Sequence, residues 1–316
     1  MRMFFAITLM ATLVIMSISP AMADSVSVNF ESGYSFGSVN GQNGWLSTGP
    51  YDQAVSANSL YPSFGSKSLR ISDAYTTQGF GDQTFAPPVT NAAGEADSTD
   101  GSYSRGTLQN HFETQFSIAS QTGTYQPGMH TSVSPDRGDG SRMSYLRFED
   151  TPAGIEVYFD DVQGLVPVGT DGCTTTVCAN FVEVQIASGL SRSIPHTAKI
   201  VMDFVNGPSN DRVKVYMDGV LVKTGTSWED YYRYDPESSF EQSPRIVKTV
   251  LFRESGAAHA ADFLHGYLFD NFSEMSGTVP TNGNQCKNGG FQGLIRSDGT
   301  SFKNQGDCVS YTNNGK

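Results

Sequence analysis

The sequence predicts an all-β fold in which two antiparallel sheets pack face to face. Many short segments between Ser25 and Met275 alternate apolar with polar residues, and closely spaced turn signals separate them. Thirty-three glycines favour frequent turns. After residue 23, helical periodicity is not sustained beyond a turn or two, which argues against the crossover helices of a parallel α/β sheet.

Residues 1–23 have the three zones of an export signal. Arg2 comes first, residues 3–18 are apolar, and Ala21-Met22-Ala23 provides the small residues that signal peptidase recognises. The apolar run is too short to favour a membrane span. We therefore expect a mature chain that begins at Asp24 and is secreted or held outside the cytoplasm, in a periplasm or at a cell surface, without inserting into a membrane.

The net charge of the chain restricts the classes of partner that it is expected to bind. Arg2 is the only charged residue of the signal, so the remaining chain carries 19 Lys and Arg against 32 Asp and Glu, a net charge of −13. This acidity argues against nucleic acid and against anionic membranes. Two interpretations stay open, namely solubility outside the cell and Ca²⁺ binding by clustered aspartates.

Period-two alternation identifies the strands, because it gives each one a buried face and a solvent-exposed face. The clearest example has Phe112, Thr114, Phe116 and Ile118 on one face and residues 111, 113, 115 and 117 on the other. The same pattern recurs, in chain order, at residues 26–30, 67–71, 129–133, 155–160, 182–186 and 198–204.

A hairpin and two closing strands complete the predicted domain. Residues 213–217 and 220–222 meet across Asp218-Gly219, and Asp-Gly suits the positive φ angles of a two-residue turn. Residues 228–234 are aromatic and acidic, which fits a short helix or a surface loop. Residues 245–253 and 263–272 are predicted as the closing strands, so we assign the β-sandwich domain to residues 24–277.

The C-terminal part is predicted to be a separate appendage. Residues 278–285 form the linker, because apolar alternation stops there, and residues 286–316 are too few for an apolar core of their own. Cys173 lies near Cys178, and Cys286 near Cys308, which favours two local disulfides although three pairings are formally open. Neither cluster has the C-x-x-C step or the nearby His of a zinc site. We expect one disulfide to close a small C-terminal hairpin.

Three segments together resemble the concanavalin A-like (laminin G-like) jelly-roll superfamily. Its first strand and loop resemble Phe30-Glu31-Ser32-Gly33-Tyr34 with Val39-Asn40-Gly41-Gln42-Asn43-Gly44-Trp45. Its "YvDG" hairpin resembles Val215-Tyr216-Met217-Asp218-Gly219-Val220-Leu221, and its closing strand resembles Phe269-Asp270-Asn271-Phe272. The likeness covers roughly residues 24–277, and residues 286–311 resemble a short paired-Cys tail of other exported microbial proteins.

The resemblance implies a jelly roll of two curved sheets, in a superfamily whose members often bind carbohydrate and sometimes cleave it. Its glucan hydrolases carry Glu-x-Asp-x-x-Glu on one strand, a pattern that this sequence lacks. Glu156 and Asp160 share a strand face, either as a catalytic pair or as a solvated edge. Its lyases use a Gln-x-His pair, and Gln185-Ile186-Ala187 lacks the His.

We expect a binding site on the concave sheet face, where planar polar side chains pair with sugar hydroxyls. Tyr145, Tyr158 and Trp228 are the aromatics available to stack on sugar rings. His111 and His130 are expected on neighbouring strands, as surface imidazoles or as a ligand-facing pair. The alternative is that these polar positions only keep one sheet face hydrated. The predicted ligand-binding residues are His111, Glu113, Gln115, His130, Arg147, Glu183, Gln185 and Arg253.

Calcium is the one cofactor that the sequence suggests. Asp218 and Asp270, with Asp160-Asp161 and Asn271, supply oxygen ligands, but no EF-hand spacing is present. The simpler interpretation makes Asp218 a turn residue and Asp270 a cap on a buried strand end.

The leading hypothesis is an exported, non-catalytic protein that recognises a polysaccharide or a cell-surface glycan. The second hypothesis is a polysaccharide hydrolase or lyase with a divergent site. The third is a structural protein of a cell surface or matrix, attached through residues 286–316. The missing carboxylate pattern favours the first hypothesis, and we assign no catalytic residue.

Overall fold

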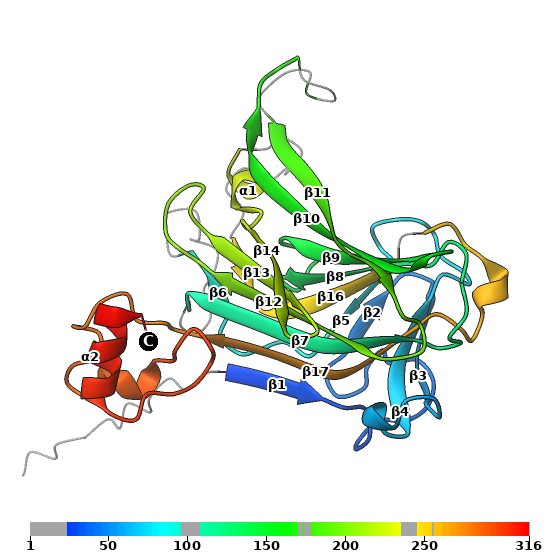
Figure 1. The fold of residues 1–316 in the computed structure, drawn as a ribbon, viewed down its shortest axis with the longest axis horizontal. Helices are drawn as coiled ribbons and strands as arrows, with labels where there is room; N and C mark the ends of the chain where they lie inside the picture. Colours follow the sequence, from blue (N-terminus) through cyan, green and yellow to red (C-terminus); the bar gives the residue numbers. More distant parts are fainter. Residues whose placement is uncertain are drawn as a thin grey trace, which may run out of the picture.

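Two antiparallel β-sheets form the body of the protein, as the period-two patterning predicts (Figure 1). The structure, a computed structural model, describes residues 24–95, 108–169, 173, 178–234, 245–254 and 256–315. The predicted export signal, residues 1–23, lies outside the described residues.

Sheet A has eight strands, and its order is not the order of the chain. The order is β14-β13-β12-β7-β17-β4-β3, and β1 pairs with β17. The closing strand β17 therefore lies between β7 and β4, a crossover typical of jelly rolls and Greek keys. The bounds are β1 Asp24–Val28, β3 Asp52–Ala57, β4 Lys67–Ser72, β7 His111–Ser120, β12 His196–Asp203, β13 Arg212–Met217, β14 Val220–Gly225 and β17 Tyr267–Gly277.

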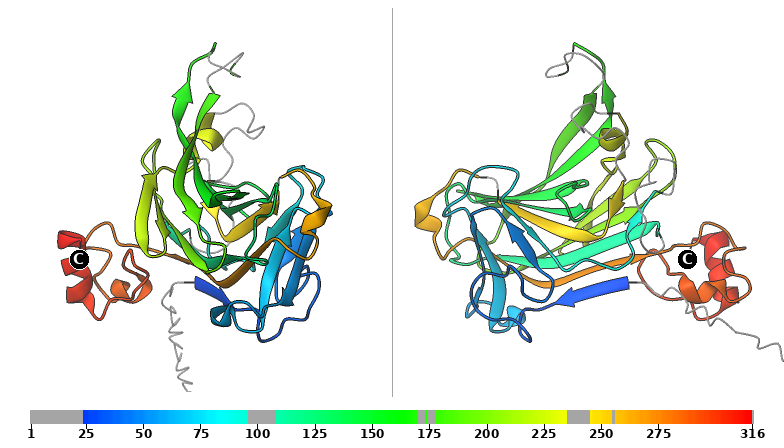
Figure 2. Two further views of the ribbon diagram at one scale, coloured as in Figure 1. Left: turned by 45° about the vertical axis from the view of Figure 1, so that its right-hand side comes forward. Right: turned by 180° about the vertical axis from the view of Figure 1, so that it is seen from behind.

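Sheet B has seven strands in the order β11-β10-β9-β8-β16-β5-β2. Its two longest strands, β10 and β11, extend beyond the rest of the sandwich (Figures 1 and 2). The bounds are β2 Leu46–Thr48, β5 Gln83–Phe85, β8 His130–Asp136, β9 Tyr145–Thr151, β10 Gly154–Val166, β11 Cys178–Leu190 and β16 Thr249–Glu254. A separate pair joins β6 (Ala93–Gly94) to β15 (Ile246–Val247).

The inner faces of the two sheets meet in a largely aromatic core. Phe116 of β7 in sheet A lies against Phe148 and Phe252 of sheet B, with ring centroids 5.9 and 6.1 Å apart. All three side chains are fully buried. Phe112, Thr114, Phe116 and Ile118 face this core, which confirms the predicted alternation. The core leaves the outer face of each sheet to carry the polar residues of the same strands.

Short helices occupy the connections. Residues 229–234 form α1 (Glu229–Tyr234), one of the two interpretations that the sequence left open. Two 3₁₀ turns, η1 (Pro62–Phe64) and η2 (Ala260–Asp262), lie in loops of the sandwich. The last strand begins at Tyr267 rather than at residue 263, because η2 and the loop after it come first.

The C-terminal appendage is helical where a hairpin was expected. It contains η3 (Gly290–Gly293) and α2 (Gln305–Asn314), and its extended pairing is a single bridge between Ile295 and Ser301. The Asn304 side chain caps α2 by accepting a hydrogen bond from the Asp307 backbone N–H, at 2.9 Å. This Asn-x-x-Asp spacing was readable in the sequence, and it explains why the segment ends as a helix.

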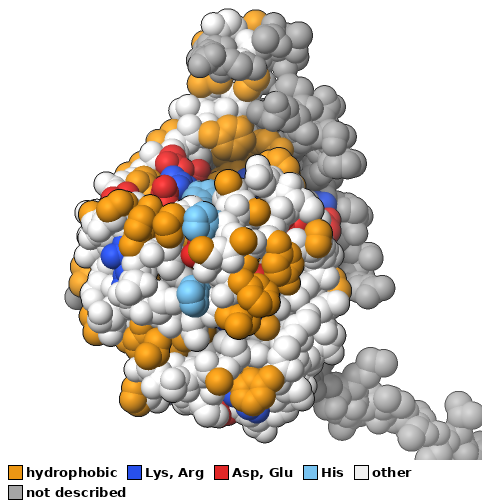
Figure 3. Space-filling view, turned by 90° about the vertical axis from the view of Figure 1, so that its right-hand side faces the viewer, with side chains coloured by type: hydrophobic (Ala, Val, Ile, Leu, Met, Phe, Trp, Pro, Cys, Tyr) orange, Lys and Arg blue, Asp and Glu red, His pale blue; other side chains and the backbone are white. Residues whose placement is uncertain are grey.

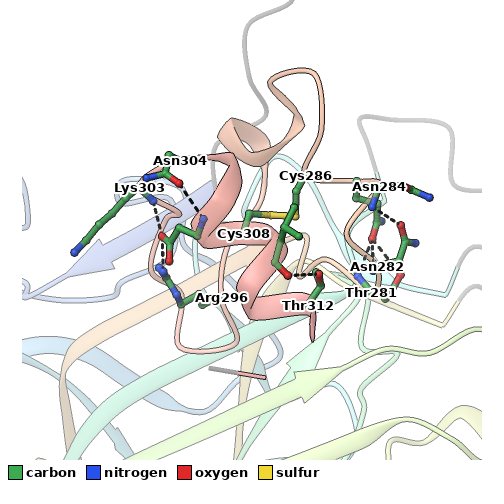
Figure 4. The surroundings of a disulfide bond; sticks show 12 residues. Thr281, Asn282, Asn284, Cys286, Arg296, Lys303, Asn304, Cys308 and Thr312 are labelled. Carbon is green, nitrogen blue, oxygen red and sulfur yellow. Dashed lines mark hydrogen bonds and ion pairs between the residues drawn. A yellow bond between two sulfur atoms is a disulfide. The ribbon is translucent and has the colours of Figure 1, made fainter. Parts of the chain in front are cut away.

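Both predicted disulfides are present. Cys173 pairs with Cys178 next to the ends of β10 and β11, and Cys286 pairs with Cys308 of α2 (Figure 4). The second bridge lies in a small apolar cluster with Leu294 and Phe302, so the appendage packs around its disulfide. In the described part of the chain, no helix has both the length and the apolar character that a membrane crossing requires.

Candidate functional site

The eight predicted ligand-binding residues divide between the two sheets. Strands that follow one another in the chain can belong to different sheets: β7 lies in sheet A, and the next strand, β8, lies in sheet B. His111 and His130 are therefore not neighbours, and the pair expected from the sequence does not form. The sheet B group is His130, Arg147, Glu183, Gln185 and Arg253, and the sheet A group is His111, Glu113 and Gln115.

A continuous row of side chains crosses the outer face of sheet B. The strand register aligns one residue from each of the seven strands, and directly opposed residues of an antiparallel sheet point to the same side. At about 4.8 Å per strand, the row is roughly 29 Å long. Its members, in order from β11 to β2, are Gln185, Tyr158, Arg147, Ser132, Arg253, Gln83 and Thr48.

Arg147 is the centre of the charged part of this face. Its guanidinium donates to Glu149 Oε2 at 2.6 Å and forms an ion pair with Glu183 Oε1, also at 2.6 Å. Its carbon Cζ lies 4.1 Å from the centre of the Tyr158 ring. Burial acts to lower the pKa of Arg147, but the hydrogen bonds to Glu183 and Glu149 outweigh it and raise the pKa. The guanidinium is thus held in place by two carboxylates and one aromatic ring.

His130 is held in its neutral form beside this cation. Its Nε2 lies 3.0 Å from Arg147 Nη1, and because Arg147 can only donate, Nε2 is the acceptor of this hydrogen bond. Burial, followed by the charge of Arg147, lowers the pKa of His130 to about 4. At neutral pH the imidazole is therefore uncharged and carries its proton on the other nitrogen.

Two further groups on β10 complete the polar surface. The Tyr158 hydroxyl donates to Glu156 Oε2 at 2.6 Å, and this hydrogen bond is the main reason that the pKa of Tyr158 rises to about 12. Burial, followed by the charge of Glu183, raises the pKa of Asp160 to about 6. The Asp160 carboxyl lies beside the Tyr145 side chain, which acts to lower its pKa but does not outweigh burial.

Aromatic rings and a further arginine also lie near the row. Arg253 Cζ lies 4.2 Å from the centre of the Phe80 ring, and Phe80 is 72% exposed. Arg142 stacks on Tyr145 at 4.4 Å and lies 5.3 Å from Trp228. Sequence reasoning named Tyr145 and Trp228 but missed Phe80, whose only signal is a large aromatic between glycines, in Gly79-Phe80-Gly81.

Figure 3 shows the side of the molecule that lies on the right in Figure 1, where charged and hydrophobic side chains share the surface. Acidic, basic and imidazole side chains lie next to one another near the top of that face, and hydrophobic side chains adjoin them. A surface of this kind combines hydrogen-bonding groups with apolar contact area, which is what saccharide recognition requires.

Two of the three predicted residues of sheet A, His111 and Glu113, have protein partners of their own. His111 is fully buried, and its Nδ1 lies 2.8 Å from Asp203 Oδ1. Glu113 forms a 2.7 Å ion pair with Lys199 on the neighbouring strand β12. Gln115 is exposed next to them. These residues lie on the outer face of sheet A, on the opposite side of the core from Arg147.

Asp218 and Asp270, the predicted calcium ligands, lie three strands apart in sheet A. Their separation is therefore about 14 Å, too far for one cation to touch both. Asp218 accepts from the Thr197 N–H and lies 2.8 Å from His196 Nδ1. Asp270 accepts from the Ser68 hydroxyl at 2.9 Å, and burial raises its pKa to about 7. Calcium at either residue stays a prediction.

One buried acidic cluster has metal-like spacing. Ligand atoms of Glu95, Asp211 and Glu229 lie within 4.8 Å of one another. Glu95, however, is paired with Arg233 and Arg245, which supply the compensating positive charge. Burial raises the pKa of Asp211 to about 7 and that of Glu229 to about 8, so both carboxyls take up protons readily. Protons and arginines account for this cluster without a cation.

Several groups of the sheet B face that a lyase could use already have partners in the protein. A lyase needs a cation free to neutralise the carboxylate of a uronic acid, whereas Arg147 already holds two carboxylates. A tyrosine base must accept a proton, whereas the Tyr158 hydroxyl donates to Glu156 and has a raised pKa. His130 is neutral, but its acceptor nitrogen Nε2 is already hydrogen-bonded to Arg147.

Comparison with known proteins gives remote likenesses only. No protein family and no curated protein matches this sequence. An endo-β-1,4-glucuronan lyase from the fungus Trichoderma reesei is 12% identical, with a TM-score of 0.37 over 82% of this chain and 96% of that one. A family 7 alginate lyase with bound substrate is 11% identical, with a TM-score of 0.34 over 73% and 89% of the two chains.

The CBM2 module of an evolved Dit from Lactobacillus casei phage J-1 is also 11% identical, with a TM-score of 0.36 over 81% of this chain and 97% of that one. Sequence identities and TM-scores this low do not support assigning the activity of any of these proteins to this chain. The β-sandwich assignment rests on the strand order and register of the chain itself, and the function rests on the side chains of its outer faces.

Proposed function

We propose that this protein is an exported, non-catalytic glycan-binding protein whose binding face is the outer surface of sheet B. The observation that carries the proposal is the row of side chains across all seven strands. Its planar polar groups run from Gln185 to Gln83, and two aromatic rings adjoin them, Tyr158 at Arg147 and Phe80 at Arg253. Sugar hydroxyls pair with such planar groups, and sugar rings stack on exposed aromatic faces.

The chemistry of the individual groups supports binding of a polysaccharide or a cell-surface glycan. Gln185 presents an exposed amide, and His130 is a neutral imidazole on the same face. Arg147 is already neutralised, so the centre of the face does not demand an anionic ligand. Two disulfides support a location outside the cytoplasm, where such bonds persist.

A glycan array, run with and without Ca²⁺, tests the proposal directly. We expect hits that weaken about tenfold or more in Tyr158→Ala and in Gln185→Ala, because each variant removes a stacking or hydrogen-bonding group. Tyr75→Ala and Gln292→Ala are matched controls, because they remove the same chemical groups away from the row. An array without hits, or hits that all four variants retain equally, would overturn the proposal.

One observation favours a second candidate function, a polysaccharide lyase with a divergent site. His130 is neutral and its Nε2 lies 3.0 Å from Arg147 Nη1, so an imidazole that can accept a proton once this hydrogen bond opens adjoins a cation. Incubation with alginate, pectate and glucuronan, followed by ultraviolet absorbance of the unsaturated product, separates the two functions. Product formation that His130→Gln abolishes would replace the binding proposal by the lyase.

A further inference from the structure

The appendage is fixed against the outer face of sheet A by specific contacts. The Ile295 N–H donates to the Thr278 carbonyl at 3.0 Å, and Asn110 exchanges two hydrogen bonds with the backbone of Val279. Ile295 also packs so closely on Gly277 that a β-carbon there would lie 2.2 Å from Ile295 Cδ1. The appendage and sheet A therefore present a preformed junction, at the left of Figure 1.

Two adjoining clefts lie in this junction. One has a volume of about 400 Å³ and the other of about 410 Å³, and Lys214 and Ser297 line both. Volumes of this size suit one or two sugar units, and binding sites are common where two parts of a protein meet. The wall from sheet A includes Gln115 and Tyr216, and the wall from the appendage includes Asp298.

The lining of the clefts carries more positive than negative charge, although the whole chain has a net charge of −12. In the described part of the chain, no carboxylate oxygen lies within ion-pairing distance of Lys214 or Arg212, whereas Lys199 is paired with Glu113. Asp203 and Asp298 are the two acids of the cleft lining. The environment of Asp203 is the more cationic. Burial opposes its ionisation, but His111, with Lys214 and Arg212, keeps its pKa below the usual range.

We propose that these clefts form a second ligand site, separate from sheet B, that binds a carboxylated saccharide. Lys214, which lines both clefts, would pair with the carboxylate, and Arg212 would support it from the second cleft. The Tyr216 ring and the Gln115 amide would contact the sugar ring and its hydroxyls. The turn at Ser297 and Asp298 would close the site from the appendage, so the disulfide-closed tail has a role in recognition.

Tetragalacturonate is a suitable probe, and its methyl-esterified form is a neutral control of the same shape. Titration of the full-length ¹⁵N-labelled protein should shift the amide signals of Lys214, Tyr216 and Ser297 with the acid but not with the ester. The apparent affinity should fall with added salt, because the interaction is a charge pair at the surface.

Lys214→Ala should weaken binding of tetragalacturonate about tenfold or more, and Lys214→Arg should restore most of it. Lys303→Ala is the matched control, because this lysine is an exposed residue of the appendage outside the cleft lining. Ser297→Tyr fills the cleft from the opposite wall and tests the site without a change in sheet A. Circular dichroism confirms that each variant folds.

The result distinguishes this site from the proposed function of sheet B. Tyr158→Ala should leave the shifts at Lys214 and Ser297 intact even if it abolishes glycan binding on sheet B. The inference is overturned if the acid causes no shifts at these amides, if acid and ester shift them equally, or if Lys214→Ala and Lys303→Ala bind the acid equally well.

Discussion

His130→Gln should make the protein less sensitive to acid. Gln keeps an acceptor for Arg147 Nη1, which lies 3.0 Å from His130 Nε2, but it cannot titrate. In the folded protein the pKa of His130 is about 4, mainly because of burial, whereas in the unfolded chain it should be about 6.5. The unfolded state therefore binds a proton first as the pH falls.

The sign and size of the effect follow from this difference. The stability that depends on neutral His130 is fully present above pH 6.5 and is lost as the pH falls through 6.5 towards 4. Between pH 8 and pH 5 the loss should be about 2 kcal/mol in the free energy of unfolding. Urea unfolding of wild type and His130→Gln, followed by tryptophan fluorescence at both pH values, measures it.

The control is His265→Gln, which removes an exposed imidazole far from Arg147 along the chain. Its stability should change with pH in parallel with that of the wild type. If His130→Gln also ran parallel to the wild type, or lost more stability on acidification, the reasoning about a buried neutral imidazole would be refuted.

Three further predictions concern the core, the appendage and the predicted calcium. Phe116→Ala should reduce the free energy of unfolding, measured by urea titration, by about 3–5 kcal/mol, because Phe116 is fully buried between the sheets. A loss below about 1 kcal/mol would contradict the core assignment. Replacement of both Cys286 and Cys308 by Ser should destabilise the appendage by about 3 kcal/mol. Amide hydrogen exchange should become faster in α2 and stay unchanged in β7. Exchange in α2 as slow as in the wild type would contradict the prediction. Since burial raises the pKa of Asp270 to about 7, stability should fall as the pH rises from about 4 to 7, and Asp270→Asn should flatten this fall in thermal melts. Calcium should raise the melting temperature of the wild type at pH 8 but not that of Asp270→Asn, and an equal rise in both would remove Asp270 as a ligand.

The sequence was informative where a residue's environment depends on its own strand. Alternation placed Phe112, Phe116 and Ile118 in the core correctly, and local spacing paired both sets of cysteines. It also predicted which residues point away from the core, but His111, expected on a solvent-exposed face, is fully buried. The sequence could not show which of these residues lie on the same sheet. A polar residue on β7 and one on β8 have the same local pattern, and only the strand order assigns them to different sheets.

The long-range arrangement of the site could not be read from the sequence. The row from Gln185 to Gln83 depends on β16 lying between β8 and β5, a neighbourhood set by chain crossovers rather than by local pattern. Phe80 carried no periodicity because it lies in a glycine-rich loop. The helix α2 was missed although its cap was visible, because two cysteines in a short tail suggested a hairpin.

The most direct test of the binding face is a chemical-shift map of the full-length ¹⁵N-labelled protein with the strongest neutral glycan from the array. The account predicts that the largest shifts fall on the amides of Tyr158, Gln185 and Ser132, together on the outer side of sheet B. Shifts confined to sheet A, the appendage or the loops at the ends of the strands would contradict it.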